Sequence, residues 1–390
     1  MTKRKATRAA HGAGSIRKRA DGRWEGTATV GRDPLTGKHI RKSVYGKTQA
    51  EAREKLTQIT AAVDDGTFTE PSKLSVSQWL DVWAAEYLEH VKSRTVYTYK
   101  SVCNLYLKPA IGPVKLTSLS AHTIQTLYNN LGREKGLSPK TVKNAHGVLR
   151  KALQQAVELD YLRSNPAAVC KLPRIEKPAI KPLDDDATTA FLAAIDGHRW
   201  GNLYLVTLFT GMRQGEALGL SWPSVDFEKG SILIKQQLQR NRFTAVYEIG
   251  PIKNDKSRSI TPAPSVMAAL REQKRLQAGW RLMAGGAWEN EYDLVFTTKL
   301  GGHLVHNTVW KSYKKIVASI GLPAARFHDL RHSYAVASLQ AGDDIKTVQE
   351  NLGHHTAAFT LDTYAHVTEK MKQDSAARME QYIADRKAGK

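Results

Sequence analysis

The sequence of 390 residues is poor in cysteine and in long apolar stretches. Its two cysteines, Cys103 and Cys170, stand far apart without Cys-x-x-Cys spacing, so neither a disulfide framework nor a zinc site is expected. No run of about 18 apolar residues could span a membrane. The basic start, Lys3-Arg4-Lys5, lacks the apolar stretch of a signal peptide. A cytoplasmic protein without a membrane partner is therefore expected.

Acidic residues are also scarce. The chain has 37 Asp and Glu against 58 Lys and Arg, which gives a formal net charge of +21. Such an excess indicates a polyanionic partner, and nucleic acid is the one that a basic multidomain chain fits best. Residues 1–60 hold fifteen basic and five acidic side chains, so about half of the excess lies in a sixth of the chain. We expect this segment to contact DNA.

Metal-binding patterns are missing too. Seven histidines lie between His303 and His366, but none forms a His-Glu-x-x-His motif and few carboxylates are near them. Phosphodiester chemistry with two metal ions needs several carboxylates to hold those ions. We therefore expect no metal ion, and arginines can neutralise a phosphate in its place.

The first residues predict a small α+β domain over 1–67. Three short strands are expected, followed by a helix that Thr48 caps, and their ranges are 15–20, 24–30, 39–45 and 48–63. A sheet this narrow can enter a major groove. The predicted DNA contacts are its basic side chains, Arg17, Lys18, Arg19, Arg23, Arg41 and Lys42. The alternative interpretation is a basic face turned to solvent.

Residues 74–170 predict an all-α domain of four or five helices. The expected segments begin at Ser75 or span 94–107, 121–131 and 139–159. In the first helix, Trp79, Trp83 and Tyr87 recur every four residues, and such a stripe is typical of a core. A proline-rich basic linker follows over 171–182.

Residues 183–390 predict a mainly α domain with a small antiparallel sheet in 231–239 and 247–260. Three clusters in this part could carry chemistry: Thr210-Gly211-Met212-Arg213-Gln214-Gly215-Glu216, His328-Asp329-Leu330-Arg331-His332, and Leu352-Gly353-His354-His355 with Tyr364 ten residues after His354. A glycine break would expose Arg213 while Glu216 fixes its fork for a phosphate. Each cluster alone is also compatible with a structural role.

Taken in order, these clusters resemble the tyrosine recombinase family, specifically the integrases of phages and integrative elements. The resemblance is sharp over about 205–370 and architectural before 180. It implies that Arg213 and Arg331 clamp the scissile phosphate, that His328 transfers a proton and that His354 hydrogen-bonds a phosphate oxygen. It further implies that Tyr364 attacks phosphorus and forms a 3′-phosphotyrosine. Because that bond stores the phosphodiester energy, no cofactor is expected.

The family also uses a lysine as general acid for the leaving 5′ hydroxyl. Lys253 is the predicted residue, in Pro251-Ile252-Lys253-Asn254-Asp255-Lys256-Ser257-Arg258. Asn254 departs from the usual Lys-Thr pattern, so Lys256 is the alternative.

The resemblance implies that residues 74–170 bind the core sites of the attachment-site DNA and that residues 1–67 bind its arm sites. A helix over 368–388 would dock onto a neighbouring subunit of a homotetramer on DNA, with an excisionase or a host DNA-bending protein as accessory partner. Two other functions share the features: a type IB topoisomerase-like enzyme and a non-catalytic DNA-binding regulator. The arm-like domain argues against the first and the complete residue set against the second.

Overall fold

The computed structural model describes residues 14–32, 38–65, 74–176, 181–252, 256–353 and 367–388. The chain divides into two compact units, Met1–Glu176 and Lys177–Lys390, and each is described by itself. The division falls within the predicted linker. The boundary between the predicted domains 1–67 and 74–170 is not tested by it and stays a prediction. Among the described residues, no helix combines the length and the apolar character that a bilayer span needs.

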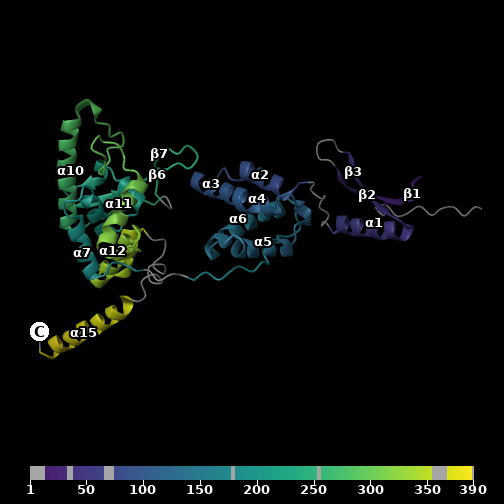
Figure 1. Ribbon diagram of the computed structural model, residues 1–390. Coiled ribbons are helices and arrows are strands. Elements are labelled where there is room, and N and C mark those ends of the chain that lie inside the picture. Colours follow the sequence, from purple (N-terminus) through teal and green to yellow (C-terminus); the bar gives the residue numbers. More distant parts are fainter. Residues whose placement is uncertain are drawn as a thin grey trace, which may run out of the picture. The chain divides into compact units, whose positions relative to one another are not determined.

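The N-terminal unit begins with a three-stranded antiparallel sheet in the order β1-β2-β3 (Figure 1). The strands and the following helix are β1 (Ser15–Lys18), β2 (Trp24–Arg32), β3 (His39–Gly46) and α1 (Gln49–Asp64). Gly22 turns the chain between the first two strands with a φ of 83°, and the Thr48 hydroxyl accepts the Glu51 amide to begin the helix. The predicted sheet with one helix is confirmed.

A helical bundle makes up the rest of this unit. Its elements are α2 (Val76–Glu86), α3 (Ser93–Val102), the π-helical turn η1 (Cys103–Leu107), α4 (Lys108–Ile111), the 3₁₀ turn η2 (Leu116–Ser118), α5 (Ala121–Arg133) and α6 (Pro139–Glu158). Trp79 and Trp83 are fully buried as predicted, and the Trp79 indole donates to the Ala152 carbonyl at 2.9 Å. The prediction for Tyr87 was wrong, because Tyr87 lies at the end of α2 and is 39% exposed.

The C-terminal unit is mainly helical, as predicted. Its helices are α7 (Asp185–Ile195), α8 (Gly201–Thr210), α9 (Gln214–Leu218), the 3₁₀ turns η3 (Trp222–Ser224) and η4 (Gly285–Ala287), α10 (Pro264–Ala284), α11 (His306–Ser319), α12 (Asp329–Gln340), α13 (Ile345–Leu352) and α15 (Val367–Lys387). The apolar α8 packs against both α10 and α12.

The strands of this unit form two small antiparallel sheets where the sequence suggested one. They are β4 (Val225–Asp226), β5 (Ser231–Ile234), β6 (Gln236–Arg240), β7 (Tyr247–Pro251) and β8 (Arg258–Ile260). β5 pairs with β4 and β8, whereas β6 pairs with β7. Each predicted strand region is therefore divided between two sheets.

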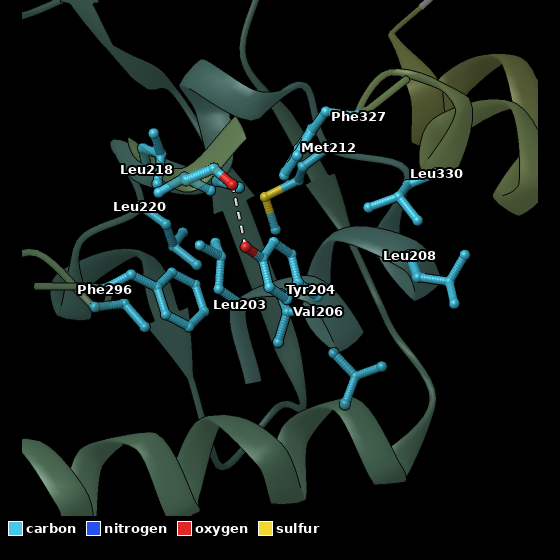
Figure 2. Close-up of a cluster of buried hydrophobic side chains, with 14 of the residues drawn as sticks. Leu203, Tyr204, Val206, Leu208, Met212, Leu218, Leu220, Phe296, Phe327 and Leu330 are labelled. Atoms are coloured by element: carbon cyan, nitrogen blue, oxygen red, sulfur yellow. Dashed lines mark hydrogen bonds between the residues drawn. The ribbon is translucent and has the colours of Figure 1, made fainter. Parts of the chain in front are cut away.

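The core of the C-terminal unit surrounds α8 (Figure 2). The hydroxyl of the buried Tyr204 donates to the Val309 carbonyl at 3.1 Å. Met212, Phe327 and Leu330 belong to the same buried cluster. They are direct chain neighbours of Arg213, His328 and Arg331. Packing of these apolar side chains therefore fixes the backbone from which the predicted site residues project.

Candidate active site

A glycine ends α8 two residues before Arg213. Gly211 has a φ of 63°, in the left-handed region that strains other residues. A Cβ atom there would lie 2.6 Å from side-chain atoms of both Leu352 and Tyr334. The position therefore needs glycine for its conformation and for its space. The chain then turns, and Arg213 takes an extended conformation at the start of α9.

Glu216 holds Arg213 in place, as predicted. Its Oε1 accepts Nη1 of Arg213 at 2.7 Å, and its Oε2 accepts the Arg213 backbone amide at 3.0 Å. The Glu216 side chain has no exposed surface, whereas that of Arg213 is 23% exposed. The guanidinium is thus anchored on its buried side and reaches solvent on the other.

A second arginine contacts the same carboxylate. Nη2 of Arg258, on β8, donates to Oε2 of Glu216 at 2.6 Å, and Nη1 donates to Oε1 at 3.2 Å. Burial raises the pKa of Glu216, but the hydrogen bond and charge of Arg258, with the charge of Arg213, outweigh it and hold this pKa at about 2. Sequence reasoning assigned Arg258 no role, because it lies 42 residues from Glu216 and belongs to no local pattern with it.

Arg331 is buried with 2% of its surface exposed. Its Nη1 donates to the carbonyl of Gly211 at 2.8 Å, and its Nη2 donates to the carbonyl of Leu352. These carbonyls lie at the C-terminal ends of α8 and α13, where the helix dipoles carry partial negative charge. Through Gly211, the structure brings Arg331 to the loop that carries Arg213.

His328 precedes α12 and lies in the same region. Its ring centroid is 5.0 Å from that of His332, with the rings nearly perpendicular. Burial lowers the pKa of His328 to about 4, and His332 and the two arginines add to this effect. The imidazole is therefore neutral at pH 7 and can accept a proton.

The end of α13 completes the described part of the site. Gly353 ends this helix with a φ of 62°, and a Cβ atom there would lie 3.1 Å from Nη1 of Arg258. His354 follows it directly in the chain. The predicted residues Lys253, His354 and Tyr364 lie outside the described residues, while Lys256 is described and exposed. The structure thus brings together Arg213, His328 and Arg331 of the six predicted catalytic residues.

The predicted DNA contacts of the N-terminal sheet divide between its two faces. A Cβ on Gly26 would touch Ala52 of α1, so Gly26 faces the helix, as do side chains in register with it. The register therefore places Lys18 and Lys42 on the same face as Gly26, the one that the helix covers. Arg17 and Arg41 belong to the opposite, open face.

The open face carries a buried acid at its centre. Oε2 of Glu25 accepts Nε of Arg17 at 2.8 Å, and its Oε1 accepts the Tyr45 hydroxyl at 3.2 Å. The Arg19 guanidinium lies 5.3 Å from the centre of the Tyr45 ring. Arg23 pairs with Asp21 in the turn at 3.0 Å. Arg17, Arg19 and Tyr45 thus form one ordered cluster on this face.

Comparison with known families and proteins gives consistent matches along the chain. The phage integrase family model matches residues 183–371, and that of a phage integrase N-terminal SAM-like domain matches residues 75–132. A tyrosine recombinase XerC-like protein of Caldanaerobacter subterraneus subsp. tengcongensis is 31% identical over 369 residues, which cover 90% of this chain and 93% of that protein. An integrase of Streptomyces ambofaciens is 28% identical over 366 residues, which cover 92% of this chain and 93% of that protein.

Solved structures share the fold. The Tn1549 transposon integrase in complex with a circular intermediate DNA aligns with a TM-score of 0.67 and 21% identity, covering 78% of this chain and 99% of that one. A lambda integrase tetramer bound to a Holliday junction aligns with a TM-score of 0.55 and 18% identity, covering 88% and 94%.

Proposed function

The chain belongs to the phage integrase family of tyrosine recombinases, which break and rejoin DNA at specific sites, and we propose that Arg213, His328 and Arg331 form its scissile-phosphate site. One observation carries this proposal. Arg331 donates to the carbonyl of Gly211, two residues before the Glu216-bound Arg213, and a neutral imidazole lies in the same region. Fixed cations beside a proton acceptor are what phosphoryl transfer without a metal ion requires.

The proposed reaction is the one that the family resemblance implies for these residues together with Tyr364, Lys253 and His354. The Tyr364 hydroxyl attacks phosphorus, a 3′-phosphotyrosine bond forms, and the bond from phosphorus to the 5′ oxygen breaks. His328 accepts the tyrosine proton, and the leaving 5′ oxygen takes a proton from Lys253, with Lys256 as the alternative donor. Arg213 and Arg331 stabilise the negative charge of the pentacoordinate transition state, and His354 hydrogen-bonds a phosphate oxygen. Attack by a 5′ hydroxyl on the phosphotyrosine reverses these steps and rejoins a strand.

We also propose the partners of each part. Residues 1–67 bind arm sites through the sheet, and residues 74–170 bind core sites together with the C-terminal unit. Because lambda integrase forms a tetramer on a Holliday junction, we propose a homotetramer on DNA here as well. The exposed Met379, Tyr382 and Ile383 of α15 offer an apolar face to a neighbouring subunit. The enzyme would act on DNA in the cytoplasm, with an excisionase or host DNA-bending protein as accessory partner.

The experiment that tests this function is covalent trapping. In a core-site duplex with a nick a few nucleotides 3′ of the scissile phosphate, the short fragment that carries the new 5′ hydroxyl diffuses away after cleavage, so the protein stays attached to the 3′ phosphate. We expect the intact chain to form this adduct without metal ion or nucleotide. Tyr364→Phe should form none and should bind the duplex with unchanged affinity, because it lacks only the nucleophilic oxygen. An adduct in that variant would identify another nucleophile.

A further inference from the structure

We propose that Arg258 is a positioning residue that balances the charge of Glu216, so that Arg213 keeps its positive charge available to the phosphate. This inference rests on the proposed function, because it concerns the same phosphate site. It assigns a role to a side chain that lies beyond the six predicted catalytic residues. Three features of the structure carry it: the charges of the cluster, the division of its hydrogen bonds and the elements that it joins.

The first feature is the net charge of the cluster that Arg213, Glu216 and Arg258 form. Arg213 and Glu216 alone form a neutral ion pair, and a neutral pair attracts a phosphate poorly. With Arg258 the cluster holds two guanidinium groups and one carboxylate, a net charge of +1. Because the carboxylate is buried, water screens it little, and a second cation is the group that can offset it.

The second feature is that the two arginines make different hydrogen bonds to the Glu216 carboxylate. Arg258 reaches both carboxylate oxygens with its two terminal nitrogens, while Arg213 uses only Nη1 of its side chain on Oε1. The side chain of Arg258 is 8% exposed and that of Arg213 is 23% exposed. The more buried Arg258 therefore makes most of the side-chain hydrogen bonds to the carboxylate, and the more exposed Arg213 faces the solvent from which DNA arrives.

The third nitrogen of Arg258 joins another element to the cluster. Nε donates to the carbonyl of Asn351 at 2.7 Å, in the last turn of α13. Arg331 holds the next carbonyl, that of Leu352. Arg258 thus connects β8 and α9, which carries Glu216, to the end of α13, directly before His354 in the chain. A lysine could supply the charge at this position but not the fork that makes these three contacts.

The test compares cleavage of a normal scissile phosphate with cleavage of a methylphosphonate, which carries no negative charge at that position. On the phosphate, we expect Arg258→Gln to slow single-turnover adduct formation by about tenfold or more, as for loss of one buried charged partner. On the methylphosphonate, we expect the loss to shrink to about threefold or less, because Arg213 no longer has an anion to neutralise. Equal losses on both substrates would overturn the proposal in favour of a merely structural role.

A double variant gives an independent readout. Glu216→Gln together with Arg258→Gln removes both charges, leaves Arg213 as the cation and still offers it an amide oxygen. We expect this variant to cleave the phosphate faster than Arg258→Gln alone, which is a coupling that additive damage cannot produce. A double variant slower than the single one would contradict the charge-balancing role.

Folding and function have their own controls. Arg275→Gln removes an exposed arginine that pairs with Glu272 three residues away, so it should leave cleavage unchanged. If Arg258→Gln does not fold, Arg258→Lys replaces it, since it keeps the charge but not the fork. We expect it to cleave both substrates more slowly, with a ratio of phosphate to methylphosphonate rates within about threefold of that of the unaltered chain; a larger change of this ratio in a folded protein overturns the proposal. If the unaltered chain forms no adduct, the proposed function itself has failed.

Discussion

At the scale of single residues, burial decides what His328 can do. An imidazole with the ordinary pKa of about 6.5 would be partly protonated near neutral pH and could then accept no further proton. The pKa of His328 is about 4 in the free protein. The ring is therefore in the neutral form at pH 7, which is the form that can accept a proton.

This lowered pKa can be measured directly. The imidazole resonances of His328 should titrate with a midpoint at about pH 4 in the free protein, and His328→Gln identifies them by their loss. Because the pKa in the folded state lies below the unfolded value, the neutral ring stabilises the fold fully above about pH 6.5. That contribution is lost as the pH falls toward 4.

The stability measurement follows the same sign. Between about pH 6.5 and 4, the free energy of unfolding should fall more steeply for the unaltered chain than for His328→Gln, which has no group to protonate. Equal slopes, or a midpoint near 6.5 in the intact protein, would show that the ring is exposed to solvent.

The two partners of an ion pair could be predicted from the sequence only where they are close in the chain. Arg213 and Glu216 are three residues apart, so a helical turn suffices to pair them. Arg258 meets Glu216 of α9 only because β8 pairs with β5 and brings residue 258 close to this helix. Its role depends on tertiary structure, and sequence spacing carries no sign of it.

At the scale of elements, the end of α8 is the position most sensitive to substitution. Gly211→Ala would combine left-handed strain with contacts of 2.6 Å to Leu352 and Tyr334. We expect a loss of about 2–4 kcal/mol in the free energy of unfolding by urea, from strain of about 1 kcal/mol and overpacking of about 1–3 kcal/mol. Adduct formation should fall as well, since the Gly211 carbonyl holds Arg331.

Gly230 provides the matched control for this variant. It has the same φ of 63°, but a Cβ atom there would have nothing within 4 Å. Gly230→Ala should therefore lose only the strain, about 1 kcal/mol, and keep its cleavage rate. Similar losses in both variants would mean that the contacts across α8, α12 and α13 matter little.

Elements defined by local signals were predictable, and those defined by pairing were not. The Asp21-Gly22 turn and the Thr48 cap fixed the N-terminal sheet and helix correctly. The region 231–239 read as one strand, yet its two halves pair with different partners, β8 and β7. The predicted burial of Tyr87 was wrong for a similar reason. Helix α2 ends before this residue, so the helical periodicity that predicted its burial no longer applies.

At the scale of the whole molecule, the excess of +21 charges concerns association with DNA. Arg41 lies on the open face of the N-terminal sheet, paired in register with Thr29. If that face meets DNA phosphates, Arg41→Gln should reduce the slope of log K against log salt by about 0.9, the value for one phosphate contact. Filter binding or fluorescence anisotropy at several salt concentrations measures it.

Lys55 on α1 is the control for that measurement, because Glu51 already pairs with it at 2.7 Å. Lys55→Gln should leave the slope unchanged. A slope that changes equally in both variants would indicate general charge attraction without a defined contact face. The order of the predicted parts along the chain came from charge distribution, turn and cap signals and helical periodicity, whereas their boundaries stay predictions.

The anchoring of Arg331 has a consequence for how the enzyme can diverge. The two bonds described for its guanidinium end on main-chain oxygens, those of Gly211 and Leu352. Substitutions of the exposed side chains of α13 do not remove a main-chain oxygen, provided that this helix still ends at Gly353. The position of the Arg331 guanidinium should therefore tolerate changes of side chain at the exposed positions of α13.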